Sequence, residues 1–119
     1  MEEITIMEIY LHEFNKKFMV KQSNKNMRKT YELQLKMAQT DDVEGKSPIE
    51  QIKLMLELTD AMVDYTTSLL KLNTKQQEVL DSLESDATFE LINHITQRML
   101  GMTEQEIKDA QKEEIDPKK

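Results

Sequence analysis

The residues able to do chemistry are few and scattered along this chain of 119 residues. There is no cysteine, which excludes disulfides, thiolate catalysis and thiolate zinc sites. Glu90 and His94 stand four apart in a stretch with helical periodicity, and Glu8 and His12 share that spacing. Either pair could supply two metal ligands, but two ligands do not complete a site, and no HExxH motif is present. We therefore predict no metal site.

Nucleophilic and acid–base catalysis have little support in the sequence. The five serines lack a nucleophile-elbow context, and three of them stand where helix caps are expected. The carboxylates fall on predicted polar faces or at helix starts, whereas acid–base catalysis needs two of them in a sheltered cleft. Gly45 and Gly101 are the only glycines, too few for a phosphate-binding loop. The sequence thus predicts no catalytic residue, no cofactor and no enzymatic activity.

Charge and hydropathy narrow the classes of partner. The net charge is −7, with +2 in residues 1–38, −4 in residues 39–74 and −5 in residues 75–119. An acidic surface repels phosphate backbones, so we predict no nucleic-acid partner. The exception is a modest basic cluster, which consists of Lys16, Lys17, Lys21, Lys25, Arg28 and Lys29. No apolar run exceeds three residues, so no membrane partner is expected, and the acidic start Met1-Glu2-Glu3 favours a cytoplasmic protein.

The first 22 residues differ from the rest of the chain. Residues 4–11 are rich in β-branched and aliphatic side chains with partial alternation, and residues 18–20 form a second short apolar run. A short β-hairpin is one interpretation and an opening helix is the other.

From Ser23 or Asn24 onward the pattern is helical. One apolar face is predicted for the first helix, formed by Met27, Tyr31, Leu35 and Ala38. An acidic linker at residues 40–46 follows. Ser47-Pro48-Ile49-Glu50 then forms a capping box with proline at the first helical position, so a long helix is predicted from residue 48 to residue 71 or 72.

Three shorter helices are expected after the long one. Asn73 and Thr103 begin capping boxes, and Ser85 or Asp86 is predicted to cap the helix between them. Gly101 is predicted to end that middle helix in a left-handed conformation. Together these patterns predict a mainly α fold, a compact helical domain around one long central helix at residues 1–112. Residues 1–22 are the candidate hairpin, and residues 113–119 form a predicted flexible tail.

The long helix carries a wider apolar arc than one core face requires. We interpret its far side as a partner-binding row, which a C-terminal pair of residues extends: Leu54, Leu58, Ala61, Tyr65, Leu72, Met102 and Ile107. The nine methionines are consistent with an adaptable binding surface. The alternative is that the N-terminal segment and the shorter helices cover both sides of the long helix.

Two stretches resemble a known family. Residues 24–34 (NKNMRKTYELQ) and 95–107 (ITQRMLGMTEQEI), with the acidic linker and the long capped helix between them, are similar to tail assembly chaperones of long-tailed phages and prophages of Gram-positive bacteria. The resemblance covers nearly the whole chain in order and length. It implies a mainly helical protein that binds the tape-measure protein in the host cytoplasm and helps to recruit tail-tube subunits during virion morphogenesis.

Other functions remain open from the residues alone. The protein could be a structural head–tail or tail component of the virion. It could also be a small acidic regulator that binds a host protein, or that binds DNA through the basic cluster. Self-association into a homo-oligomer is a further alternative for the apolar row.

Overall fold

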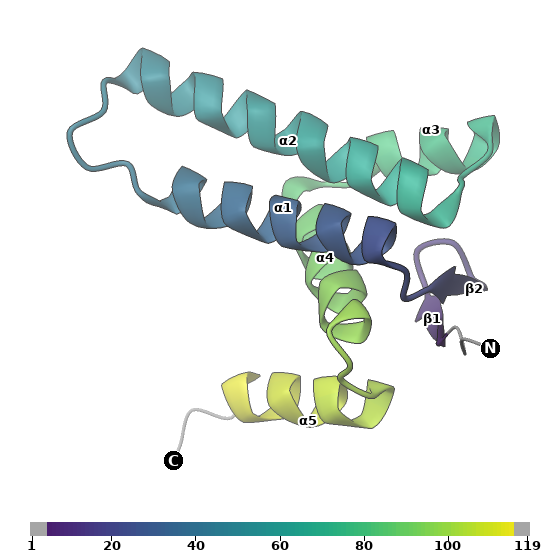
Figure 1. Cartoon of the computed structure of the whole chain (residues 1–119). Coiled ribbons are helices and arrows are strands. Elements are labelled where there is room, and N and C mark those ends of the chain that lie inside the picture. Colours follow the sequence, from purple (N-terminus) through teal and green to yellow (C-terminus); the bar gives the residue numbers. More distant parts are fainter. Residues whose placement is uncertain (1–4, 116–119) are drawn as a thin grey trace.

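The structure, a computed structural model, describes residues 5–115. Two strands are followed by five helices: β1 (Ile6–Leu11), β2 (Lys16–Lys21), α1 (Asn24–Asp41), α2 (Pro48–Leu70), α3 (Thr74–Ser82), α4 (Ser85–Met99) and α5 (Glu104–Ile115) (Figure 1). The predicted fold class is confirmed: a mainly helical domain with a short N-terminal hairpin and a long α2. Of the predicted tail at residues 113–119, α5 includes 113–115, and 116–119 lie outside the described residues.

The N-terminal segment is a hairpin and not a helix. β1 and β2 pair antiparallel, with Ile9 opposite Phe18. Side chains alternate between the two faces of a strand, so Ile9, Leu11, Phe18 and Val20 point to the same side, and all four are buried in the core. Asn15 makes the turn with a φ of 51°, a left-handed conformation that asparagine tolerates better than most residues.

Helix α1 is rotated relative to the sequence prediction. Tyr31 and Leu35 of the predicted apolar face are exposed, and the buried residues of the helix are Thr30, Leu33 and Thr40. Two threonines can be buried because the Thr30 hydroxyl donates to the Asn26 carbonyl at 3.0 Å and the Thr40 hydroxyl donates to the Lys36 carbonyl at 2.8 Å. These bonds satisfy the hydroxyls locally, which removes most of the cost of burying them.

Both ends of α2 have a clear local cause. Ser47 Oγ accepts from the Glu50 backbone N–H at 3.2 Å, and Glu50 Oε1 accepts from the Ser47 N–H at 2.8 Å, which confirms the capping box. The backbone N–H of Ser47 lowers the pKa of the Glu50 carboxyl, because that hydrogen bond favours the charged form. At the other end Lys71 takes a left-handed φ of 55° and stops the helix.

Replacing Ser47 with alanine is expected to lower the free energy of unfolding by about 1 kcal/mol, because a backbone N–H of the first turn loses its acceptor. Urea denaturation of Ser47→Ala measures this. Ser85→Ala is the control, because the first turn of α4 has no side-chain cap and Ser85 lies inside the helix. Equal losses in the two variants would contradict the capping role.

The core lies where α4 crosses the hairpin, α1 and α2. Four α4 side chains are almost fully buried there: Leu91, Ile92, Ile95 and Met99. Helix α5 packs on α4 after Gly101, whose φ of 104° confirms the predicted left-handed break. The predicted cap of α4 is corrected, because the N-cap position is Glu84 and makes no side-chain cap bond. Among residues 5–115 no helix is long and apolar enough to cross a membrane.

Arg98 ties α4 to the hairpin. Its Nε and Nη2 donate to the Glu8 carbonyl of β1 at 3.1 and 2.6 Å, and its Nη1 donates to the Met102 carbonyl at 2.8 Å. The Gln22 side chain adds a second link, because its Nε2 donates to the Met99 carbonyl at 2.7 Å. Hydrogen bonds from a charged donor are stronger than neutral ones, so Arg98 fixes the hairpin on the helical body.

Helices α1 and α2 form an arm. They run side by side and antiparallel, and the loop that joins them lies at the end remote from the hairpin and α4 (Figure 1). The start of α2 and the end of α1 therefore have one another as neighbours, while the other halves of both helices are covered by the body. This unequal covering determines which residues of α2 remain free.

Candidate functional site

The predicted binding row on α2 faces the interior of the domain. Leu58, Tyr65 and Leu72 are 3%, 5% and 6% exposed, and all three belong to the hydrophobic core. Leu54 and Ala61 are half-buried on the same side. The cause is α1, which packs against this side of α2 and places the Tyr65 hydroxyl 2.7 Å from Thr30 Oγ1.

Met102 and Ile107, the two C-terminal residues of the predicted binding row, also pack within the domain. Ile107 is 2% exposed, and Met102 is half-buried beside the start of α5. The capping box at this helix start is present, because Thr103 Oγ1 accepts from the Glu106 N–H and Glu106 Oε1 accepts from the Thr103 N–H. Met102 and Ile107 flank this box as a hydrophobic staple does.

Most of the predicted row is therefore covered within the chain itself. Four of the seven have almost no free surface in this chain, as the alternative of a fully covered row expects. Contact with a partner through the remaining three stays a prediction. The wide apolar arc of α2 has another side, and the structure leaves that side open.

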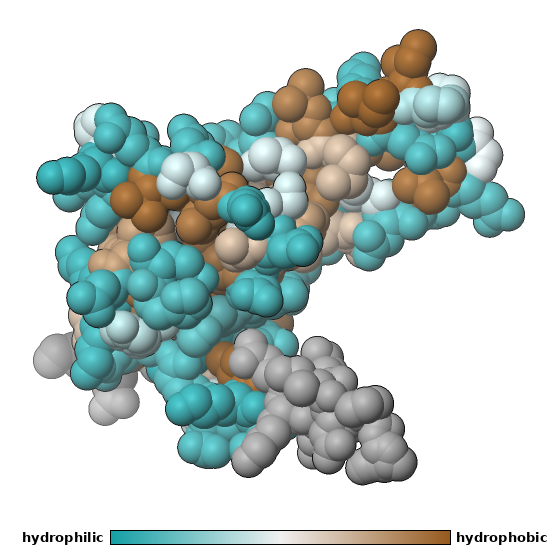
Figure 2. Space-filling model, turned by 180° about the vertical axis from the view of Figure 1, so that it is seen from behind, coloured by the Kyte–Doolittle hydropathy of each residue, from teal (hydrophilic) through white to brown (hydrophobic). Residues whose placement is uncertain are grey.

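The open side of α2 carries four large apolar residues near its start. Ile49, Ile52 and Leu56 are 78%, 69% and 62% exposed, and Met55 beside them is also exposed. We call these four residues the outer row. Figure 2 shows hydrophobic side chains gathered along the upper edge of the projecting arm, where α2 lies. Exposed apolar residues that cluster in this way mark interaction surfaces.

Sequence reasoning missed the outer row for an identifiable reason. Ile52, Met55 and Leu56 belong to the wide apolar arc of this helix, but hydrophobicity alone does not tell which side of an almost all-round apolar helix faces the core. The first turns of α2 also precede the segment that α3, α4 and the hairpin cover. A usable signal was the acidic linker at residues 40–46, because a loop of this kind places the adjoining helix start far from the core.

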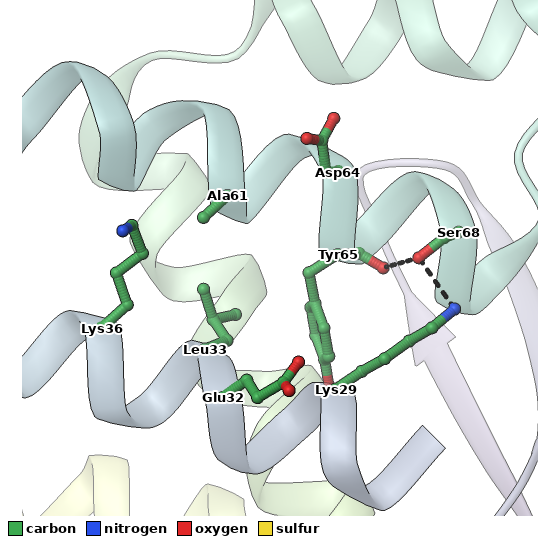
Figure 3. A pocket seen from close by; sticks show the side chains of 8 residues that line it. All are labelled: Lys29, Glu32, Leu33, Lys36, Ala61, Asp64, Tyr65 and Ser68. Carbon is green, nitrogen blue, oxygen red and sulfur yellow. Dashed lines mark hydrogen bonds between the residues drawn. The ribbon is translucent and has the colours of Figure 1, made fainter. Parts of the chain in front are cut away.

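A hollow of about 340 Å³ lies between α1 and α2 (Figure 3). Lys29 Nζ donates to Ser68 Oγ at 3.1 Å across one end, and Lys36 Nζ lies 3.9 Å from Glu57 Oε1 near the other end. Leu33 and Ala61 give the hollow an apolar lining, which suits an aliphatic side chain better than a charged ligand. Burial raises the pKa of Tyr65 in its wall to about 12.

Both histidines line a second hollow, of about 740 Å³, between the hairpin turn, α4 and α5. His94 Nε2 lies 2.8 Å from Glu104 Oε1, and His12 Nε2 lies 3.3 Å from Glu13 Oε2. The proposed Glu8–His12 pair does not form, because Glu8 instead pairs with Lys17 at 2.8 Å. Within residues 5–115 no three histidine or carboxylate side chains gather closely enough to hold a metal ion.

The basic cluster is divided between β2 and α1, and several of its members have partners in the chain. The Lys17 ammonium group donates a hydrogen bond to the Glu8 carboxylate, and this bond raises the pKa of Lys17. Lys16 lies 5.2 Å from the centre of the Phe18 ring, and Lys29 donates to Ser68. These contacts favour the interpretation of a solvated patch over a nucleic-acid surface.

Comparison with known proteins gives one finding. The model of a family described as phage tail assembly chaperone proteins, TAC, matches residues 7–114. No curated protein and no solved structure matches the chain. The matched range includes all but the first residue of β1, then β2, α1 to α4 and all but the last residue of α5.

Proposed function

This chain belongs to the phage tail assembly chaperone family, and from that membership we propose that it binds the tape-measure protein in the host cytoplasm and helps to recruit tail-tube subunits. The observation that carries the proposal is the outer row on α2. A helix of a client protein could bury these side chains, as amphipathic helices do in apolar grooves and on apolar faces.

The surface chemistry supports a binding role. Burying a large apolar side chain stabilises by roughly 1.5–3 kcal/mol, so an unpartnered row of such residues favours association. The net charge of −7 makes copies of the chain repel one another and so keeps them soluble. This suits a protein that must hold an aggregation-prone client. The arm places the row away from the body, where a long helical client has access to it.

We propose further that the protein acts by binding and not by catalysis. The histidines and carboxylates described above are engaged in local pairs or helix caps, and neither hollow combines a nucleophile with a base and an orienting group. Hydrolase activity that survives repurification of the protein would contradict this part of the proposal.

Co-expression tests the client assignment. The tape-measure protein encoded by the same phage genome should be largely insoluble when it is expressed alone and soluble when this chain is present, with both recovered in one complex. The control is a co-expressed acidic protein of similar size. A tape-measure protein that remains insoluble, or that is soluble without forming a complex, would argue against the role.

The protein content of the finished virion distinguishes an assembly chaperone from the alternative, a structural component of the virion. An assembly chaperone is released before the tail is complete, so mass spectrometry of purified virions should find none of this chain. Stoichiometric amounts in the virion would favour a structural head–tail or tail component.

A further inference from the structure

The outer row continues along α2 at the spacing of a helix–helix seam. Ile49, Ile52, Leu56, Thr59 and Val63 follow one another at intervals of three, four, three and four residues. This alternation is the heptad pattern with which one helix packs against another. The seam is uncovered at Ile49, Ile52 and Leu56 and enters the body at Val63, which is half-buried. Its spacing therefore fits a helical occupant.

Thr59 does not interrupt the seam. Its hydroxyl donates to the Met55 carbonyl one turn earlier at 2.9 Å, so the polar group is satisfied within the helix. The methyl group of threonine can then face an apolar neighbour at little cost. From Ile49 to Val63 the seam extends for about 21 Å along the helix axis. An occupant of about two to three heptads would cover it.

The arm that carries the seam is predominantly negative. Residues 41–60, which comprise the end of α1, the loop and the first half of α2, contain six acidic residues and two lysines, a net charge of −4. All six carboxylates are on exposed residues. A second copy of this chain would bring the same negative charge to the interface, whereas a helix with lysine or arginine beside its apolar stripe would be attracted.

We propose that this seam on α2 is the docking site for a basic amphipathic helix of the client protein. The inference rests on the proposed chaperone function and adds the site and the chemistry of the bound segment. Ile52 and Leu56, at the centre of the uncovered part, contact the apolar stripe of that helix. Asp60 beside the seam, and the acidic residues elsewhere on the arm, attract its lysines or arginines.

Two designed peptides test the chemistry. Each has about 21 residues in three heptads, with leucine at the a and d positions. One carries lysine at the flanking e and g positions and the other carries glutamate. Isothermal titration with the full chain should detect binding of the lysine peptide that weakens as salt is raised, and no binding of the glutamate peptide. Equal binding of both peptides would overturn the charge argument.

Two variants test the site. Ile52→Lys and Leu56→Lys should each weaken binding of the lysine peptide about tenfold or more, a change of about 1.4 kcal/mol. Val79→Lys is the matched control, because Val79 is another exposed apolar residue in a helix, on α3 away from the seam. Circular dichroism should give all three variants the melting temperature of the unchanged protein. Undiminished binding in both seam variants would place the docking site elsewhere.

Co-expression with the tape-measure protein separates this inference from the function on which it rests. If the unchanged chain keeps the tape-measure protein soluble and Ile52→Lys/Leu56→Lys does not, both proposals are supported. If the double variant is as effective as the unchanged chain, the seam is not the docking site although the function stands. If the unchanged chain is itself ineffective, the proposed function fails first. A dimer in light scattering that the double variant makes monomeric would identify a second copy as the occupant.

Discussion

Replacing Leu58 with glutamate is expected to lower the free energy of unfolding by about 3 kcal/mol or more, and so to lower the melting temperature sharply. Leu58 lies in the core between α1 and α2 and is 3% exposed. Its neighbours are the other apolar residues of the core cluster, so the new carboxylate would be buried in apolar surroundings. Urea denaturation followed by circular dichroism measures the change.

Ile52→Glu is the matched control for this prediction, because it introduces the same charge on the opposite side of the same helix. Ile52 is 69% exposed, so its replacement should change the free energy of unfolding by no more than about 0.5 kcal/mol. A stable Leu58→Glu protein that has lost client binding would instead restore the original sequence interpretation, in which the Leu58 side of α2 faces a partner.

The protein is expected to lose about 2–3 kcal/mol of stability as the pH rises from 10 to 12, through the titration of Tyr65. Burial raises the pKa of Tyr65 from 10.0 to about 12 in the folded state. The unfolded chain therefore releases this proton first, near pH 10, and binds fewer protons than the folded chain up to pH 12. Stability is fully present below pH 10 and falls as the pH rises through 12.

The geometry at Tyr65 gives the physical reason. The Tyr65 and Thr30 hydroxyls share a 2.7 Å hydrogen bond in the core, where a phenolate would be poorly solvated. Ionised Tyr65 would bury a negative charge, and the hydrogen bond with Thr30 offsets only part of that cost. Denaturation of Tyr65→Phe and of the unchanged protein at pH 9 to 12 isolates this group, because the lysines titrate in both.

Tyr31→Phe is the control for the alkaline prediction, since Tyr31 is exposed on the outer side of α1. Its alkaline loss of stability should match that of the unchanged protein, whereas Tyr65→Phe should lose less. If the three proteins lose stability in parallel above pH 10, Tyr65 does not carry the effect.

The elements of this fold could be predicted from the sequence wherever a local signal specifies them. Ser47 with Glu50, Asn73 with Gln76, and Thr103 with Glu106 each form the reciprocal bonds that their spacing predicts. The hairpin was one of two open interpretations, because the alternation in residues 4–11 is only partial. Packing against the core decides between the hairpin and the helix. Ile9 and Leu11 are both buried, and residues two apart share a face in a strand.

The orientation of the helices could not be predicted in the same way. On α1 the apolar Tyr31 and Leu35 are exposed while Thr30 is buried, because backbone bonds within the helix satisfy the threonine hydroxyl. On α2 both sides are apolar, and the side that faces the core is set by where α1, α4 and the hairpin pack. These are long-range contacts, and the local pattern of hydrophobic residues does not contain them.

The hydrogen bonds from Arg98 to β1 also bear on aggregation through the edge of the sheet. In the described part of the chain the sheet has two strands, so each strand has one edge without a neighbouring strand. Such an edge is a template on which extended chains can add and start aggregation. Arg98 engages the Glu8 carbonyl of β1, so this acceptor is not available to an added strand. A tail assembly chaperone works beside unassembled protein, and the bonded carbonyl makes the outer edge of β1 a poorer template for such pairing.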